Sequence, residues 1–525
     1  MEEMYDIPKE KFEFVNENEK ITDKKFDTKP IGYFKDAFIR FRRNKGSVVA
    51  FIIIMMILLF AIIVPPASRN KARTSLVTYY SKKGPYVPGG VGLYNGGKAQ
   101  DLSEVKLIYT ISLGVAADGY DGKVETLEVG LKSYYQPLNS FDKNARIVRQ
   151  GRDKTKFFSS NVNEYMAVGF KYITVTKQKY EEILKWEKEN PDKHVLYPLI
   201  ADNEYHFSDG IEANDANYWY KSDIRLNPIS TATGEDVLLE YSPNLELEDN
   251  YLRDDQGNLV YWKYHGGGNS DETAMRKIRV LFYNYYQFEY GSEPLYFFGT
   301  DFQGYDMGIR LATGIRLSII LAVIVSAVNF VIGAIYGALE GYYGGAVDLT
   351  LERITDILSG VPFIVVATLF QIHLAKKVGP IPSMIFAFVL TGWIGTAGTV
   401  RMQFYRFKNQ EYVMAARTLG ARDRRIIWKH IFPNTLGTLI TSSVLVIPGV
   451  IFSESMLSFL GIINLGGAEI TSLGTLLNEA NGIWVEHPHM LIAPGLIISL
   501  LMICFNLFGN GLRDAFNPTL RGSDN

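Results

Sequence analysis

The chain has 525 residues, a formal net charge of −2 and a mean hydropathy near zero, so nucleic acid is not expected as a partner. The mean hides two populations, because long apolar blocks flank a polar, tyrosine-rich segment. The apolar blocks exclude a purely water-soluble chain, since ~18 or more apolar residues form a helix that spans the ~30 Å hydrocarbon core of a bilayer.

Six membrane spans are expected in chain order. The first, 47–65, contains the uncharged run VVAFIIIMMILLFAIIV at 48–64. About 45 residues precede this run and no clear cleavage site follows, so we interpret it as an uncleaved anchor and not as a signal peptide. The other five spans are expected at 316–338, 355–374, 382–400, 436–459 and 490–509. The predicted fold class is therefore an α-helical polytopic membrane protein.

The polar segment 66–295 is expected to form an inserted α+β domain. KLIYTISLG (106–114), FKYITVT (170–176) and IRVLFYNYYQFEY (278–290) are rich in β-branched and aromatic residues and are predicted as strands. KYEEILKWEKE (179–189) is predicted as a helix, RDDQGNLVYW (253–262) as a turn at Gly257 leading into a strand, and YHGGGNS (264–270) as a flexible loop. The one cysteine, Cys504, lies in the last span, so the domain has to fold without a disulfide.

The distribution of basic residues predicts the orientation, because short loops rich in Lys and Arg stay in the cytoplasm. The first span follows the basic run RFRRNKG (40–46), which places the N-terminus inside. The domain 66–295 is then extracytoplasmic, and the loops 339–354 and 401–435 and the C-terminus are cytoplasmic. Lys376 and Lys377 in the short outer loop 375–381 disagree with this scheme, but the longer loops outweigh them. The chain divides into a tail 1–45, a helix 46–65, the domain 66–295, a five-span core 296–518 and a tail 519–525.

The segment EYVMAARTLGARDRRIIWKHIFPN (411–434) within the basic loop is the main candidate site. Ala415, Ala416 and Gly420 are small residues at helical spacing, which lets another surface come close to a helix backbone. Such a short helix suits docking into a groove on a partner, and Pro433-Asn434 is expected to stop it. The alternative is that the positive charge only fixes the membrane topology.

This segment resembles the EAA loop of ABC-importer permeases, and more widely the chain resembles the C-type subunit of dipeptide and oligopeptide permeases. The loop pattern stands here as Met414-Ala415-Ala416, Gly420 and 431–434. The other matching stretches are FGTDFQGYDMGIRLATGIRLS (298–318), IGAIYGALEGYYGG (332–345), LERITDILSGVPF (351–363), ESMLSFLG (454–461) and PGLIISLLMICFNLFGNGLRDAFNP (494–518). The chain departs from the family at Met414 (Glu in the motif), Tyr305 (usually Arg), Asn510 (usually acidic) and in its inserted domain.

The resemblance implies that the loop forms a coupling helix in a cleft of a cytoplasmic ATPase. The implied coupling-loop residues are Ala415, Ala416, Arg417, Gly420, Ala421, Asp423, Pro433 and Asn434. Arg417, Arg422, Arg424 and Arg425 would pair with acidic groups on the ATPase. Exposed ion pairs are worth only ~0–1 kcal/mol each, so the shape of the small-residue face is expected to matter more than any one arginine.

The implied function is that of a permease subunit in an ATP-driven importer of di- or oligopeptides, in the plasma or inner membrane of a prokaryote. The implied partners are a homologous permease subunit, two ABC ATPase subunits, an extracytoplasmic solute-binding protein, the peptide substrate and membrane lipid. No catalytic constellation is found in the sequence, so no cofactor is expected and ATP hydrolysis is expected on the partner subunits. The alternatives are a permease for nickel or another small solute and, from another class, a receptor with an extracellular sensor domain.

Three further motifs have competing interpretations. Gly92-x₄-Gly97-Lys98 imitates a phosphate-binding loop, but Ala99 stands where Ser or Thr is needed, which favours a surface loop. His487-x-His489 beside Glu486 suggests a metal site, but no third ligand is apparent, which favours an interfacial loop.

Glu454 ends an apolar run and is a candidate for the translocation path, with a carboxylate at the outer surface as the alternative. Glu340 and Glu352 are expected at the cytoplasmic interface, with Arg353 as a helper of Glu352.

The role of the inserted domain has three open interpretations. It could be a docking platform for the solute-binding protein or a purely structural element. It could also be a lid that contacts substrate through its aromatic residues Tyr218, Trp219, Tyr220, Tyr261 and Trp262.

Overall fold

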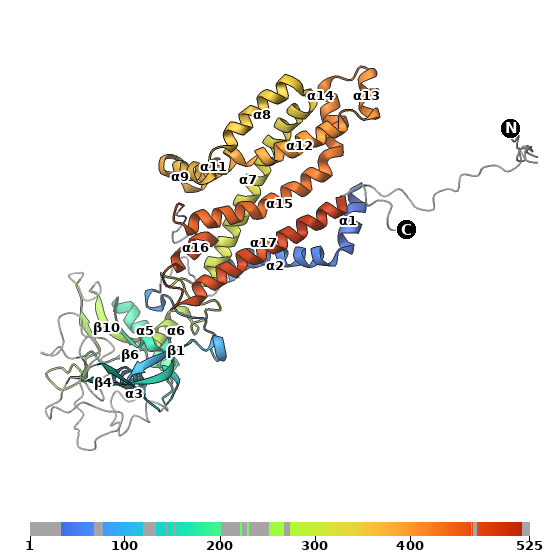
Figure 1. Cartoon of the computed structure of the whole chain (residues 1–525). Coiled ribbons are helices and arrows are strands. Elements are labelled where there is room, and N and C mark those ends of the chain that lie inside the picture. Colours follow the sequence, from blue (N-terminus) through green and yellow to red (C-terminus); the bar gives the residue numbers. More distant parts are fainter. Residues whose placement is uncertain are drawn as a thin grey trace, which may run out of the picture.

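The computed structural model describes residues 33–67, 77–118, 133–142, 144–150, 153–200, 221–222, 228–229, 251–266, 274–463, 465 and 470–516. Figure 1 shows a bundle of long helices with a mixed domain of strands and helices at one end. We call this end the domain end. The opposite end of the bundle carries α13 (Glu411–Thr418), α14 (Asp423–Arg425) and α1 (Tyr33–Arg43), and we call it the loop end.

Five helical segments are long and apolar enough to cross a membrane among the described residues, or six if one bent pair counts as a span. They are α2 (Lys45–Ala67), α7 (Met307–Tyr343), α11 with α12 (Pro380–Gly392, Ile394–Phe407), the segment Asp423–Phe459 and α17 (Pro488–Phe516). Five of the six predicted spans lie inside these segments, which confirms the helical membrane fold. The segment Asp423–Phe459 consists of α14, the π-helical turn η6 (Ile426–Ile431) and α15 (Phe432–Phe459).

The predicted span 355–374 is wrong as a single helix. It is divided between α8 (Gly345–Ser359) and α9 (Phe363–His373), which meet at an angle of 72°. Pro362 lies at the start of α9, and a proline disfavours helical geometry in the residue before it, so α8 has to end before Val361. α9 has 11 residues, which extend about 16 Å and cannot cross the bilayer alone. The short α10 (Ala375–Val378) then leads into α11.

The domain between α2 and α7 is α+β, as predicted, and its described strands pair antiparallel. One sheet has the order β1-β4-β2, with β3 also on β4; a second has the order β5-β10-β6, with β9 also on β10; β7 and β8 form a pair. The strands are β1 Gly97–Ser103, β2 Leu138–Phe141, β3 Arg146–Gln150, β4 Asp153–Asn163, β5 Phe170–Val175, β6 Leu196–Tyr197, β7 Lys221–Ser222, β8 Pro228–Ile229, β9 Trp262–Tyr264 and β10 Arg276–Leu281. The helices are α3 Glu104–Asp118, α5 Lys177–Glu189 and α6 Phe282–Tyr290, with single turns η2 Thr78–Tyr80, η3 Gly92–Tyr94 and η4 Met166–Val168. The predicted limits 66–295 and 296–518 stay predictions.

Two predicted strands of this domain are wrong in whole or in part. Residues 106–114 lie in α3, where Leu107, Ile111 and Gly114 are buried at helical spacing, so tertiary packing overrides the β-propensity of the segment. The segment 278–290 is a strand only to Leu281 and then continues as α6. The predictions for 170–176, 179–189 and the turn at Gly257 (φ +83°) are confirmed. The predicted loop 264–270 is described only to Gly266, and the rest lies outside the described residues.

The tyrosines of the domain form its core. Eight buried tyrosines pack with Leu, Val and Phe side chains in one cluster, and they are Tyr80, Tyr86, Tyr135, Tyr165, Tyr197, Tyr283, Tyr286 and Tyr296. Trp262 is one of the aromatic residues considered for substrate contact. Its ring contacts a side chain of the same domain, since the Arg276 guanidinium lies 4.2 Å from the ring centre. Residues 218–220 lie outside the described residues.

Close packing of α7 against α12 holds the loop end together. Gly333, Gly337 and Gly341 occur at four-residue intervals on α7 and face α12. A Cβ atom on Gly337 would lie 2.1 Å from the Ala397 carbonyl oxygen, so only glycine allows this approach.

Candidate functional site

The predicted docking segment forms a separate short helix at the loop end. α13 begins after an extended Gln410 and ends at Thr418, and Gly420 follows with φ +83°. The Ala421 N–H donates to the Ala416 carbonyl and the Gly420 N–H to the Arg417 carbonyl, both at 3.0 Å, which is the Schellman pattern of a helix end. A Cβ atom on Gly420 would meet nothing within 4 Å within this chain. Glycine is therefore required here by its left-handed backbone, and the space outside it is open.

The two faces of α13 differ in exposure. Val413 and Ala416 are buried against the rest of the chain, at 1% and 8% exposure, whereas Met414, Ala415 and Arg417 are exposed. Ala415 and Gly420 thus lie on the open surface, but Ala416 packs inward.

Leu419 was missed in the sequence and is the most prominent feature of this surface. Its side chain is 88% exposed, beside Met414 at 53% and Tyr412 at 40%. Because Leu419 directly precedes the glycine that ends the helix, its side chain projects from the turn. Three exposed large apolar side chains within eight residues of a basic loop are an unusual use of a water-facing surface, and a docking role for them stays a prediction.

Polar contacts fix α13 and α14 to the ends of the long helices. The Tyr342 hydroxyl at the end of α7 donates to the Asp423 carboxylate, and the Arg417 guanidinium lies 3.4 Å from the same hydroxyl. Asp423 therefore anchors the loop to α7. The Asn434 amide donates to the Tyr412 hydroxyl at 3.2 Å.

The helix stop predicted at Pro433-Asn434 is wrong. Pro433 lies in the first turn of α15, where a proline is tolerated because its missing N–H needs no helical partner. The helix continues through it to Phe459.

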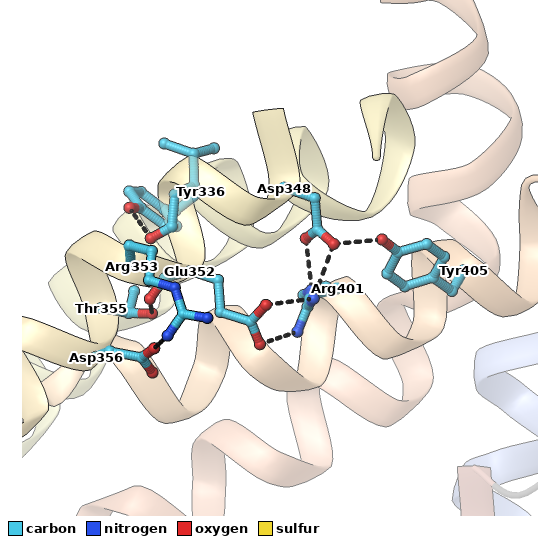
Figure 2. A network of polar contacts seen from close by, with 9 residues as sticks. Tyr336, Asp348, Glu352, Arg353, Thr355, Asp356, Arg401 and Tyr405 are labelled. Carbon is cyan, nitrogen blue, oxygen red and sulfur yellow. Dashed lines mark hydrogen bonds and ion pairs between the residues drawn. The ribbon is translucent and has the colours of Figure 1, made fainter. Parts of the chain in front are cut away.

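A guanidinium held between two carboxylates connects α12 to α8 beside the loop (Figure 2). Arg401 donates to Asp348 at 2.6 and 2.8 Å and to Glu352 at 2.9 and 3.0 Å. The expected helper of Glu352 was wrong, because Arg353 pairs with Asp356 at 3.1 Å on the same helix. Glu340 is buried at 3% exposure on α7.

Glu454 lies inside the bundle and is not an exposed carboxylate. It is 1% exposed and accepts hydrogen bonds from the Ser318 hydroxyl of α7 at 2.9 Å and from the Ser458 hydroxyl at 3.0 Å. These bonds satisfy a carboxylate that the apolar environment would otherwise make costly. Its place on a translocation path stays a prediction.

A second arginine, on α7 at the domain end, contacts α16 (Leu473–Ala480) and the loop that precedes α7. The Arg310 guanidinium lies 2.9 Å from Asp301 and donates to Glu479 of α16 at 2.8 and 3.1 Å. Burial raises the pKa of both carboxyl groups, and the positive charge of Arg310 opposes that shift. The resulting contact between the start of α7 and α16 was not predicted from the sequence, because Glu479 lies 169 positions from Arg310 in the chain.

The remaining motifs do not form a chemical centre in the described part of the chain. No group of three His, Cys, Asp or Glu residues there could hold a metal ion. His489 lies 3.1 Å from the Thr300 carbonyl, and burial lowers the pKa of His487. Gly92 begins a single turn and Lys98 lies on β1, so the strand-loop-helix context of a phosphate-binding loop is missing.

The domain carries an open groove of about 430 Å³ near the Gly89-Gly90 turn. Its lining is polar and uncharged and includes Asn95, Tyr134, Gln136, Asn139 and Asn163.

Comparisons with known proteins give two family matches. Residues 329–522 match the binding-protein-dependent transport system inner membrane component family. Residues 32–83 match the N-terminal transmembrane domain of oligopeptide transport permease C.

Individual relatives agree with these matches. The dipeptide transport system permease protein DppC of Bacillus subtilis is 41% identical over 228 residues, which are 43% of this chain and 69% of the relative. The oligopeptide transport system permease protein OppC of the same organism is 40% identical over 227 residues, 43% of this chain and 72% of the relative. DppC of Lactococcus lactis is 34% identical over 265 residues, 50% of this chain and 73% of the relative.

Among solved structures, the inward-facing MetNI methionine ABC transporter matches 40% of this chain and 98% of its own chain, with 17% sequence identity and a TM-score of 0.35.

Proposed function

The chain belongs to the family of binding-protein-dependent transport inner-membrane components, among the permease C proteins of dipeptide and oligopeptide transport systems, and from this premise we propose that it forms half of the pore of an ATP-driven peptide importer. A homologous permease subunit supplies the other half. Two ABC ATPases bind at the loop end, and a solute-binding protein delivers peptide at the domain end. ATP is hydrolysed on the ATPases, and no bond is made or broken by this chain.

The observation that carries the proposal is the exposed α13, which ends in Leu419 and Gly420 at the end of the bundle opposite the inserted domain (Figure 1). A transporter subunit has to meet its motor on one side of the membrane and its cargo on the other. The basic residues Arg40, Arg42 and Arg43 on α1, also at the loop end, support a cytoplasmic location for that end.

In the docked complex, Leu419 enters an apolar part of the ATPase cleft. Ala415 and Gly420 allow the cleft wall to approach the helix backbone, because neither residue projects a large side chain. The exposed arginines Arg422, Arg424 and Arg425 pair with acidic groups at the rim of the cleft. Met414, at 53% exposure, replaces the glutamate of the motif and adds apolar contact where the family has a charge.

Transport then follows because the partners make different contacts with the inward-facing and the outward-facing states. ATP binding draws the two ATPases together and displaces α13, and the pore changes from inward-facing to outward-facing. ATP shifts the equilibrium between the inward-facing and outward-facing states only by the difference in its affinity for these two states. The binding protein docks on the inserted domain, where the polar, uncharged groove offers hydrogen-bonding groups.

Purification and uptake together test the proposal. The tagged full-length chain, isolated from its native membrane, is expected to bring down a second permease and an ATPase. Deletion of the gene is expected to abolish uptake of radiolabelled di- or oligopeptide, and nickel uptake is expected to stay unchanged. Loss of nickel uptake with normal peptide uptake would favour a metal permease, and the absence of an ATPase would favour a receptor.

A further inference from the structure

The contacts of α8 with the rest of the chain are unusually polar for a helix in an apolar bundle. Asp348 is the buried residue of α8, whereas Leu349, Ile354 and Ile357 are exposed at 55%, 45% and 73%. Apolar packing within this chain therefore contributes little to holding α8 in place. Its attachments include the Tyr336 hydroxyl of α7, which donates to the Leu351 carbonyl at 2.8 Å, and the Arg401 guanidinium of α12 (Figure 2).

The geometry at Arg401 is that of a clamp. Asp348 and Glu352 are four residues apart on α8, so both carboxylates project from one face of the helix. The planar guanidinium reaches between them with four hydrogen bonds of 2.6–3.0 Å. The Tyr405 hydroxyl, one turn further along α12, donates to Asp348 at 2.6 Å. We use the name Arg401 clamp for Arg401, Asp348, Glu352 and Tyr405.

The chemistry of the clamp explains why it needs an arginine. A guanidinium offers a rigid fork of donors that can serve two carboxylates at once, whereas the ammonium of a lysine is a single point charge on a flexible stem. Bidentate, charge-assisted hydrogen bonds are among the strongest polar contacts in proteins. Removal of Arg401 would leave Asp348 and Glu352 facing each other, with Glu340 of α7 close enough to add electrostatic repulsion.

The two helices that the clamp joins differ in how they are connected to the rest of the chain. On one side, α12 leads through Lys408 and Gln410 directly into α13. On the other side, Gly344 between α7 and α8 and Gly345 at the start of α8 have φ of +66° and +55°, a conformation that only glycine adopts readily. The far end of α8 meets α9 at the 72° bend. α8 is thus set off from α7 by the glycine pair and from α9 by the bend, and the clamp joins it to α12.

We propose that Arg401 is a positioning residue for transport, which makes α8 move with α12 when the ATPase displaces α13. This inference rests on the proposed function, because it assumes that α13 is the element on which the motor acts. Without the clamp, α13 and α12 still move, but α8 lags behind and the pore does not change state. ATP hydrolysis and peptide transport are then uncoupled.

The test uses the full transporter, purified with its partners and reconstituted in liposomes with the solute-binding protein. Arg401→Met keeps the apolar stem and removes the donors, and Arg353→Met is the matched control. Arg353 forms an exposed pair with Asp356 within α8, at 71% and 57% exposure, and so it joins no two helices. The measured quantities are the amount of ATPase bound, the rate of ATP hydrolysis and the number of peptides imported per ATP hydrolysed.

We expect Arg401→Met to bind the ATPase and hydrolyse ATP normally but to import at least about tenfold fewer peptides per ATP, within the usual range of coupling factors. Arg401→Lys should give an intermediate loss, and Arg353→Met should match the wild type. The exchange Arg401→Glu with Glu352→Arg again places a guanidinium between two carboxylates, and it should restore much of the coupling. A merely structural role would lower thermal stability and ATPase binding together with import.

Wild-type coupling in Arg401→Met would overturn the proposal. The proposal would also fail if Arg401→Met did not assemble with the ATPase and the charge exchange restored assembly but not coupling. If Arg401→Met does not assemble, Glu352→Gln removes one of the two ion pairs at a carboxylate that is 42% exposed. That variant should lose about fivefold in coupling, and unchanged coupling would again refute the clamp. Failure of the proposed function is recognised separately, because the wild-type complex itself would then contain no ATPase or import no peptide.

Discussion

Replacement of Leu419 by serine tests the docking surface at its most exposed apolar point. The side chain is 88% exposed in this chain, so nearly all of its apolar area is available for burial against a partner. Full burial of a leucine side chain is worth about 1.5–3 kcal/mol. Loss of most of that energy should weaken ATPase binding roughly 10- to 60-fold, since every 1.4 kcal/mol is a factor of ten.

The assay is a titration of the permease pair in nanodiscs, freed of its ATPase, with purified ATPase. Val91→Ser is the control, because Val91 is 84% exposed at the domain end and loses the same kind of surface. Its effect on ATPase affinity should stay within about twofold, as for ordinary surface changes. The thermal stability of Leu419→Ser should equal that of the wild type, because the side chain makes few contacts within its own chain.

Unchanged ATPase affinity in Leu419→Ser would refute the reasoning, because a cleft that closes around α13 has to bury this 88% exposed leucine. A variant with lowered thermal stability would show instead that Leu419 packs within the permease.

Three further predictions concern the helical core and the domain end. Gly337→Ala would place a Cβ atom 2.1 Å from the Ala397 carbonyl oxygen and should cost about 1–3 kcal/mol, seen as a lower melting temperature in detergent. Glu454→Ala should cost about 1–3 kcal/mol because it leaves buried serine hydroxyls without an acceptor, whereas Glu454→Gln should keep most of the stability. Burial, with a smaller effect of Lys98, lowers the pKa of His487. The neutral imidazole therefore contributes stability above pH 6.5, and this contribution is lost as the pH falls below that value. His487→Gln should reduce this loss in thermal scans against pH.

Each of these predictions has a control or a contradicting outcome. Gly398→Ala, where a Cβ atom meets nothing within 4 Å, should be tolerated, and equal losses at Gly337 and Gly398 would argue against close packing of α7 on α12. Equal losses of stability in Glu454→Ala and Glu454→Gln would argue against hydrogen bonding to the serines as the role of this side chain. An identical decline at acid pH in wild type and His487→Gln would exclude that histidine as a source of acid sensitivity.

The long apolar helices could be predicted because length and hydropathy are local properties of the sequence. Five of the predicted spans lie in helices that cross the bundle. The sixth prediction is wrong because hydropathy does not change through Gly360-Val361-Pro362, whereas Pro362 is a local signal that ends the helix before Val361. In α3, β-branched residues indicated a strand, but the buried positions follow a helical period.

The site was predictable in outline and not in its contacts. The sequence predicts that Gly420 lets a partner approach closely, and this stays a prediction. The structure adds a conformational reason for glycine, because the backbone of Gly420 is left-handed. Arg401 was counted only as one basic residue of a cytoplasmic loop. Its partners Asp348 and Glu352 lie 53 and 49 positions away, and no local pattern links them. Long-range ion pairs depend on how helices pack, which the sequence alone does not give.

The side of the membrane on which α13 lies is the most direct test of the whole account. Cys504 is the one cysteine of the chain and is buried, so Leu419→Cys in a Cys504→Ser background gives a single exposed thiol. A membrane-impermeant maleimide should leave this thiol unlabelled in intact cells and label it in inside-out vesicles freed of ATPase, while Val91→Cys should show the opposite pattern. Labelling of Leu419→Cys from outside intact cells would contradict the assignment of the loop end to the cytoplasm and, with it, the transporter mechanism.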